Sequence, residues 1–347
     1  MAVLCKLADT AGYVASDWDL LSDPAGREYW IGHFTQHTET MLHLCAAQGT
    51  DPAAMAAFQK ELLAELDRLR ADPTSWGALT ILSFDERRER LLRKHGIADP
   101  YAQVKQRENA AALGLMVEVL AELDDLTGPP LIEALVRGIF AGNIFDLGSL
   151  ATIDNYHQEG MDFHATRERQ PARPWRVDDF DALSARLLDG PPYRQVLFFV
   201  DNAGADLILG CLPLARHLAR GGTRVVLAAN TTPSLNDITW DELQGVLDRT
   251  AQIDPVLAGL LTEGRIDTVP SGCGTPLIDL SDISDACNDA ARPADLIILE
   301  GMGRSIESNF HVAFTCDVLK IALLKDEKVA QRLGGALYDQ VCRFERA

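Results

Sequence analysis

Long apolar runs and a surplus of positive charge are both missing from this 347-residue chain. No stretch approaches the roughly 18 uninterrupted apolar residues that a membrane-spanning helix needs, so we expect no membrane association. The formal net charge of −19 argues against a nucleic-acid partner, because such a protein needs a basic face to neutralise phosphates. A small phosphorylated ligand remains compatible with this charge, provided that a metal ion, a helix amino terminus or a few basic side chains meet it locally.

Paired cysteines and a secretory leader are absent as well. The seven cysteines are scattered and include no Cys-x-x-Cys pair, which argues against a disulfide framework and against a structural zinc site. The first residues, Met1–Lys6, lack the basic segment and apolar stretch of a signal peptide. We therefore expect a cytoplasmic protein with reduced thiols, and the sequence leaves open whether it forms a homo-oligomer.

The chain has two regions that differ in the spacing of their apolar residues. Up to about residue 160, apolar residues recur at spacings of three and four, which is typical of helices. These predicted helices are Gly26–Gln48, Asp51–Ala71, Ser83–His95, Tyr101–Leu126 and Leu131–Ala141. Residues 161–190 look irregular, and from residue 191 apolar runs alternate with helical patterns. The pattern predicts an N-terminal helical bundle or cap (1–160), a connector (161–190) and an α/β metal-binding catalytic domain (191–347).

The second region has the rhythm of a mostly parallel, three-layer, Rossmann-like sheet with helices on both faces. The predicted strands are Val196–Val200, Arg224–Ala229, Ile266–Val269, Leu296–Leu299 and Leu319–Leu324, with Leu337–Phe344 as a final edge strand. The predicted helices are Leu207–Arg220, Asp241–Leu260, Asp282–Ala291 and Ser305–Cys316. Because the carboxyl ends of parallel strands share one rim, we expect the chemistry of the protein there.

The segment Asp201-Asn202-Ala203-Gly204-Ala205-Asp206 follows the first of these strands directly. A carboxylate beside a side-chain carbonyl at the rim offers two hard oxygen ligands to a divalent cation. The alternative for this segment alone is a helix cap at Asn202 followed by a turn glycine.

A third oxygen ligand comes from the loop after the second strand. Asp237 lies in this polar loop, just before Thr239, which has the spacing of a capping box. Because Asp201, Asn202 and Asp237 lack a His or Cys partner, they favour magnesium or manganese over zinc, although cobalt or nickel can substitute. Such a cation would also relieve the repulsion between these acids and an anionic substrate.

Three later strands also end in polar residues. Ser271 and Gly272 belong to a glycine-containing loop whose backbone N–H groups could approach a phosphate, although a plain turn is the better explanation of the loop alone. Glu300 and Arg304 flank two glycines in a turn that could face an anion or a metal. Lys325 could act as a point charge for phosphate or end a strand in solvent.

Several ordered motifs together resemble the damage-control phosphatase family, also catalogued as domain of unknown function 89, and in particular its pantothenate-kinase-associated branch. The matching segments are RGIFAGNIFDLG (137–148), FVDNAGADLILGCL (199–212), LAANTTPSLNDIT (227–239), DLIILEGMGR (295–304) and LKIALLKDEKVAQRLGG (319–335). The resemblance implies a metal-dependent phosphatase for small phosphorylated metabolites. It points to 4′-phosphopantetheine or a damaged derivative as the substrate, with a sugar phosphate as the alternative.

The resemblance also implies roles for individual residues. The family's Asp-Asn pair and later Asp, which bind the metal, correspond to Asp201, Asn202 and Asp237. Its Gly-Asn-x-x-Asp motif implies that Asn143 and Asp146 face the substrate, whereas the local pattern alone suggests a helix cap at Asn143.

The resemblance further implies that Glu300, Arg304 and Lys325 support the phosphate or the metal ligands. Catalysis could use attack by Asp201 or by a metal-held water, and we favour water because a coordinating carboxylate is a poor nucleophile. Asp206 could act as a base, support a metal ligand or complement the positive end of a helix.

Three other functions were considered. An NAD-dependent oxidoreductase would carry Gly-x-Gly-x-x-Gly after its first strand, where this chain has DNAGAD. An S-adenosylmethionine-dependent carboxyl methyltransferase would need no metal. A non-catalytic metabolite-binding protein would have no need of the complete oxygen ligand set.

Overall fold

A seven-stranded sheet forms the centre of the computed structural model, which describes residues 1–144 and 163–347. The strand order is β1-β7-β6-β5-β2-β3-β4. The strands are β1 (Val177–Asp178), β2 (Gln195–Phe199), β3 (Arg224–Ala229), β4 (Ile266–Pro270), β5 (Leu296–Glu300), β6 (Asp317–Leu323) and β7 (Gln340–Glu345). Neighbouring strands pair in parallel except β6 and β7, which are antiparallel. This arrangement confirms the predicted α/β fold with a mostly parallel sheet.

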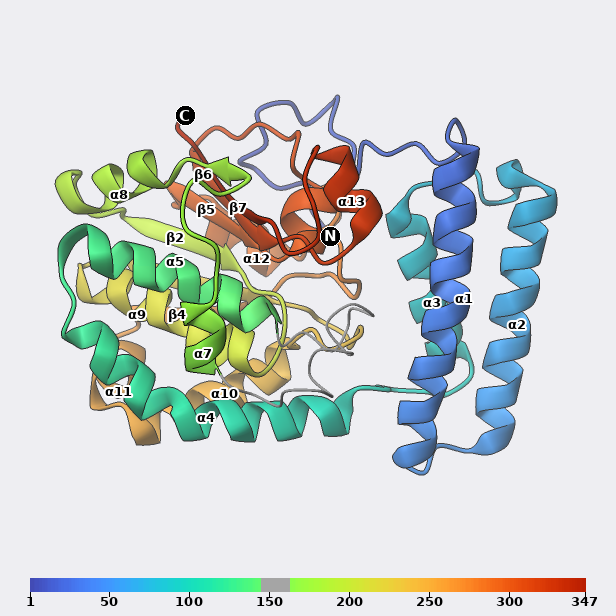
Figure 1. Cartoon of the computed structure of the whole chain (residues 1–347), viewed down its shortest axis with the longest axis horizontal. Coiled ribbons are helices and arrows are strands. Elements are labelled where there is room, and N and C mark those ends of the chain that lie inside the picture. Colours follow the sequence, from blue (N-terminus) through green and yellow to red (C-terminus); the bar gives the residue numbers. More distant parts are fainter. Residues whose placement is uncertain (145–162) are drawn as a thin grey trace.

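Helices surround this sheet (Figure 1). The α-helices are α1 (Pro24–Ala47), α2 (Pro52–Ala71), α3 (Ile81–Lys94), α4 (Ala102–Asp124), α5 (Gly128–Ile144), α7 (Phe163–Glu168), α8 (Phe180–Asp189), α9 (Leu212–Arg220), α10 (Trp240–Ile253), α11 (Pro255–Thr262), α12 (Asp285–Ala291) and α13 (Glu327–Arg332). A 3₁₀-helix, η1 (Pro73–Trp76), and two π-helices, η2 (Asp206–Cys211) and η3 (Met302–Glu307), complete the described elements. No helix in these described residues is both long and apolar enough to cross a membrane.

Successive side chains of the strands point to opposite faces of the sheet and pack in two separate hydrophobic cores. Val196 and Phe198 of β2 pack in a core that includes residues of α4, α5, α8 and α9, whereas Leu197 and Phe199 face α12 and the N-terminal segment. This alternation follows from the two-residue period of a strand, and it explains why β2 is apolar throughout. The sheet therefore has helices on both faces, as expected.

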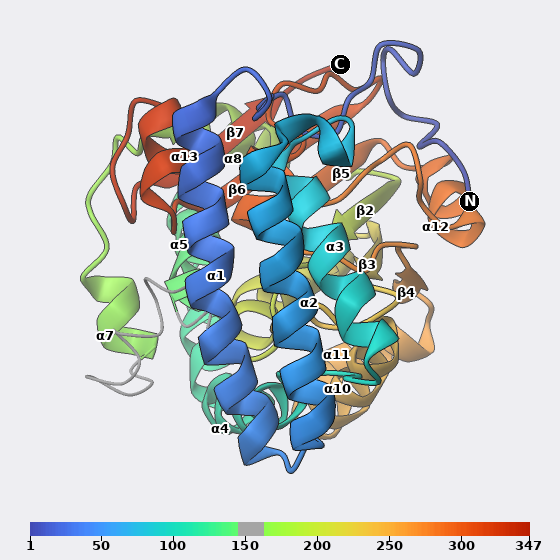
Figure 2. The same ribbon diagram turned by 90° about the vertical axis from the view of Figure 1, so that its right-hand side faces the viewer.

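Helices α1, α2 and α3 lie side by side at one end of the molecule (Figures 1 and 2). They share a third core, in which Phe34, Phe58 and Phe84 are buried, and this core also contains Leu324 and Val329 from the region around α13. Helix α5 contributes instead to the core that contains Val196 and Phe198, and so does most of α4, although Val104 of α4 packs in the third core. The division into 1–160, 161–190 and 191–347 stays a prediction.

Several element boundaries differ from the prediction. The predicted final edge strand, β7, is covered by β1, and β1, α7 and α8 lie in the segment that was expected to be irregular. The predicted helix Asp241–Leu260 is two helices, because Pro255 cannot continue the hydrogen bonding of α10 and Asp254 caps α11. The predicted helix Ser305–Cys316 is replaced by the end of η3 and by turns.

Candidate functional site

A cavity of about 630 Å³ lies where the carboxyl ends of the strands meet α1 and α3. Strand β2 lies between β3 and β5. After β2 the chain adds β3 and β4 on one side of it, and then adds β5 on the other side. Such a switch point is where open α/β sheets bind ligands. Asp201, Asn202, Asp237 and Lys325 all line this cavity, so the structure brings together four of the predicted site residues.

The loops after β2 and β3 are joined by backbone hydrogen bonds. Asn202 and Asp237 form an antiparallel bridge, and the Ile238 N–H donates to the Asp201 carbonyl oxygen at 3.0 Å. The Asn202 side chain donates its amide N–H to Asp201 Oδ2 at 3.0 Å and to Asp206 Oδ2 at 2.8 Å. The amide oxygen of Asn202 is thereby left for another partner. Asn202 does not cap a helix, since η2 begins at Asp206 and has no side-chain cap.

Arg304 connects the carboxylates of Asp201 and Asp237. Its Nη1 forms an ion pair with Asp201 Oδ1, and its Nη2 lies 2.9 Å from Asp237 Oδ2. Nη2 also donates to Asn230 Oδ1 at 3.0 Å. The side chain of Arg304 is only 2% exposed, so the guanidinium supplies buried positive charge between two buried acids. Two carboxylates and an amide oxygen at one cavity form a donor set that suits a hard divalent cation.

Behind these residues lies a buried layer of Glu300, Asp206 and Asn143. Asn143 Nδ2 donates to Asp206 Oδ1 and to Glu300 Oε1, both at 2.6 Å. Glu300 Oε2 accepts a hydrogen bond from the Asp201 N–H at 2.9 Å. Burial, reinforced by the negative charge of Asp206, raises the pKa of Glu300 well above its usual range. None of the three lines the cavity, and each contacts a residue of the site or of this layer.

Lys325 follows β6 and is 4% exposed, so it is not the solvated strand end that the sequence allowed. Its backbone N–H donates to the Met302 sulfur at 3.2 Å. Ser271 and Gly272 do not line the cavity, and their N–H groups donate to the Ala229 carbonyl oxygen and to Thr231 Oγ1. This loop therefore matches the plain-turn alternative. Asp146 lies outside the described residues.

The wall of the cavity formed by α1 and α3 was missed by the sequence-based prediction. It includes Tyr29, His33, His37, Asp85 and Arg88. The regular four-residue spacing of Tyr29, His33 and His37 marks one helix face, and this was the available signal. Nothing local indicates that this face meets a strand rim more than 150 residues away.

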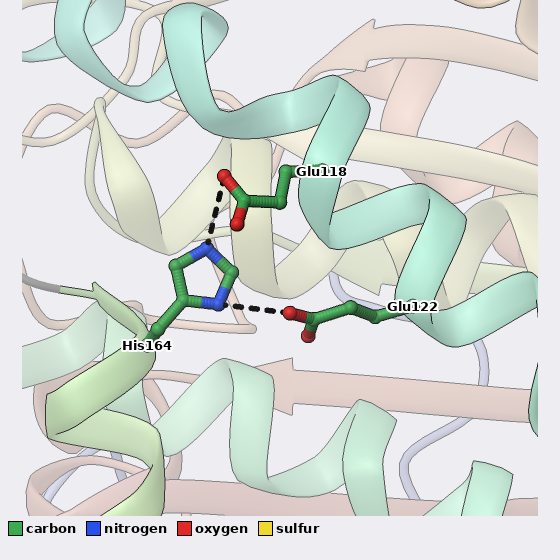
Figure 3. A group of neighbouring side chains, drawn as sticks. All are labelled: Glu118, Glu122 and His164. Atoms are coloured by element: carbon green, nitrogen blue, oxygen red, sulfur yellow. Dashed lines mark ion pairs between the residues drawn. The ribbon is translucent and has the colours of Figure 1, made fainter.

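A group of possible metal ligands lies outside the cavity (Figure 3). His164 Nδ1 lies 3.2 Å from Glu122 and Nε2 lies 3.8 Å from Glu118, and Arg167 also pairs with Glu122. Because each ring nitrogen already faces a carboxylate and Arg167 shares Glu122, we interpret the group as an ion-pair cluster.

Asp206, Cys211 and Glu300 form a second such group, which is buried. The Cys211 thiol donates to Glu300 Oε2 at 3.5 Å. Burial raises the pKa of this thiol well above its usual range. A protonated thiol is a weak metal ligand, so we interpret this group as packing behind the site.

Comparison with known proteins identifies the family. The sequence model of the damage-control phosphatase ARMT1-like domain matches residues 31–341. A mouse protein named 4′-phosphopantetheine phosphatase is 33% identical over 98% of this chain and 48% of its own length. A damage-control phosphatase of Arabidopsis thaliana is 41% identical over 84% of this chain and 80% of its own length. The chain spans less than half the length of several curated relatives that it matches.

A solved structure supports the fold. A DUF89 family protein from Pyrococcus horikoshii superposes with a TM-score of 0.61, covering 91% of this chain and 96% of that one at 14% identity. The family resemblance predicted from the sequence is thus confirmed by the extent of the family match and by the identity to the plant relative. The chain belongs to the damage-control phosphatase ARMT1-like domain family.

Proposed function

We propose that this chain is a divalent-metal-dependent phosphatase that hydrolyses 4′-phosphopantetheine or a damaged derivative of it. The convergence of Asp201, Asn202 and Asp237 on one cavity at the switch point of the sheet carries the proposal. The printed names of the mouse and plant relatives, and the family match, support phosphatase chemistry.

Asp201, Asn202 and Asp237 would hold the metal, for which Mg²⁺ or Mn²⁺ suits the oxygen donors best and Co²⁺ or Ni²⁺ can substitute. The bound metal would polarise the phosphoryl group and lower the pKa of a water. Lys325 lines the same cavity and would place its ammonium group at the phosphoryl oxygens. Arg304 would keep the two carboxylates aligned through its two ion pairs.

Hydrolysis would proceed by attack of water on phosphorus. The water oxygen bonds to phosphorus, the bond to the ester oxygen breaks, and the alcohol leaves with a proton while inorganic phosphate remains. The Asp201 carboxylate is already engaged by Arg304 and Asn202, which supports water rather than Asp201 as the nucleophile. Asp206 is 1% exposed and bonds to Asn202 and Asn143, which supports a positioning role for it.

The test is phosphate release from 4′-phosphopantetheine by the wild-type protein and by Asp201→Ala and Asp237→Ala, with Mg²⁺, Mn²⁺, Co²⁺ or Ni²⁺ supplied after chelation. Each substitution should lower kcat/KM at least about 100-fold, since even partners of metal ligands are commonly worth 10–100-fold. Titration calorimetry should show weaker metal binding by both variants. Asp289→Ala, at an exposed position of α12, is the matched control and should retain full activity.

Persistent activity in folded Asp201→Ala protein would place the catalytic centre elsewhere. A single turnover in ¹⁸O-labelled water separates the two mechanisms. Water attack should put the label in the released phosphate and none in Asp201. Label in the Asp201 carboxylate would show that this side chain is the nucleophile.

A further inference from the structure

Helix α1 carries three rings in a row along the wall of the cavity. Tyr29, His33 and His37 are each four residues apart, a spacing that puts them on one face of the helix. The ring centroids of Tyr29 and His33 are 6.2 Å apart, and those of His33 and His37 are also 6.2 Å apart. All three residues line the cavity that contains Asp201 and Asp237. These three residues are called the ring ladder below.

The ring ladder is held in place by neighbouring polar groups. The Tyr29 hydroxyl donates to Asp326 Oδ2 at 2.5 Å, and His33 Nδ1 lies 3.9 Å from the same oxygen. His37 Nε2 lies 3.0 Å from the hydroxyl oxygen of Tyr101. Burial lowers the pKa of His33, which favours its neutral ring. Because Asp326 directly follows Lys325, one short segment both anchors the ladder and carries the lysine of the site.

The cavity is larger than a phosphoryl group requires. Its volume of about 630 Å³ falls within the range of pockets that enclose a complete organic ligand. The α1 residues that line it run from Glu28 to His37, a distance of about 13 Å at 1.5 Å per residue. The cavity therefore has room for an extended group beside the carboxylates.

We propose that the ring ladder binds the organic part of the phosphate ester and favours an extended chain over a compact group. This inference rests on the proposed phosphatase function. Tyr and His side chains have an apolar body with a polar tip, so they can cover the carbon atoms of a bound ligand. The Tyr29 hydroxyl is bonded to Asp326 and His37 Nε2 to Tyr101, which fixes the two rings on either side of His33.

Gly32 gives a direct test. It lines the cavity on α1, and a Cβ at this position would have no heavy atom within 4 Å, so Gly32→Leu adds bulk to the wall without a clash. Gly114 on α4 has equally open surroundings and does not line the cavity, which makes Gly114→Leu the matched control. His33→Ala removes the central ring of the ladder.

The experiment compares kcat and KM for 4′-phosphopantetheine, glucose 6-phosphate and ethyl phosphate. The wild-type protein should prefer 4′-phosphopantetheine. Gly32→Leu and His33→Ala should raise its KM about 10-fold, the scale of a small change in a pocket wall. Both variants should leave kcat/KM for ethyl phosphate unchanged, and Gly114→Leu should change neither substrate.

Equal losses on 4′-phosphopantetheine and ethyl phosphate would show that the wall supports the phosphate site, which would overturn the inference. Unchanged kinetics in both variants, or a wild-type preference for glucose 6-phosphate, would overturn it too. In the first two of these outcomes the wild-type protein still hydrolyses 4′-phosphopantetheine, so the proposed function stands, whereas a preference for glucose 6-phosphate would overturn the proposed substrate as well. Failure of the wild-type protein to hydrolyse any of the three with any metal would instead overturn the proposed function together with this inference.

Discussion

Arg304 is the shared ion-pair partner of Asp201 and Asp237, and it places a positive charge between them. Removing one member of a buried charge cluster is usually more costly than the cluster's net contribution, because the remaining charges lose their compensation. We therefore expect the stability of the protein to depend strongly on Arg304 and, when Arg304 is removed, on added cations.

Arg304→Met should lower the free energy of unfolding by about 3–5 kcal/mol in the absence of metal, because two buried carboxylates lose their shared cation. Saturating Mn²⁺ should raise the melting temperature of this variant more than that of the wild-type protein, since the ion restores positive charge. Thermal unfolding with and without Mn²⁺ measures both effects. An unchanged apo stability would show that the guanidinium does not compensate these acids.

Asp85 predicts a pH dependence. It shares the Arg88 guanidinium with Glu89, and burial raises the pKa of Asp85 from 3.8 to about 7. Because the folded protein binds this proton more tightly than the unfolded chain, stability should fall as the pH rises through this window. The contribution is at most about 1.4 kcal/mol per pH unit. Asp85→Asn should reduce this slope in urea unfolding between pH 5 and pH 7, and an equal slope in both proteins would contradict the assignment.

At the scale of elements, the site depends on two π-helices that follow β2 and β5. The widened turn of a π-helix is uncommon and often occurs at functional sites. Here η2 carries Asp206, and η3 carries Arg304. Helix α5 packs closely against η2 through small residues, since a Cβ on Gly142 would lie 2.5 Å from the Asp206 Cα and one on Gly210 would lie 3.0 Å from the Ile139 Cα.

Gly142→Ala should therefore displace η2, lower the free energy of unfolding by about 1–3 kcal/mol and reduce phosphatase activity through Asp206 and Asn202. Gly114→Ala is the matched control, because its helical surroundings are open and alanine there should stabilise α4 by up to about 1 kcal/mol. Chemical denaturation and phosphate-release assays of both variants provide the measurements. Equal stability of the two variants would mean that the close approach of α5 and η2 is easily relaxed.

The sequence predicted the strands well but not these π-helices. Val196–Val200 and Leu296–Leu299 are apolar runs that end in acids, and a buried parallel strand is the simplest structure for them. The segment Leu207–Arg220 has an ordinary helical pattern, whereas η2 differs from an α-helix in its backbone hydrogen bonding, which the pattern of apolar residues does not reveal. The capping box at Thr239 was predictable because both of its partners lie within one turn.

At the scale of the whole molecule, the cavity unites parts of the chain that are distant in sequence. Asp201, Asn202 and Asp237 could be predicted as one set because the rim of a parallel sheet is a known meeting point. The ring ladder could not be assigned to the cavity, since α1 reaches the rim through tertiary packing around Leu324 and Val329. Half of the site thus follows from local pattern and topology, and the other half follows from the packing of the helical end against the sheet.

The sheet order also determines when the parts of the site are made during translation. Strand β2 pairs with β5, whose residues emerge about one hundred positions later, and Asp201 obtains its Glu300 contact only then. Helix α1, which carries the ring ladder, is synthesised long before either strand. During translation, the cavity wall formed by α1 and α3 is therefore synthesised well before the residues that we propose to act in catalysis. The proposed catalytic site can be complete only after Lys325 has been made.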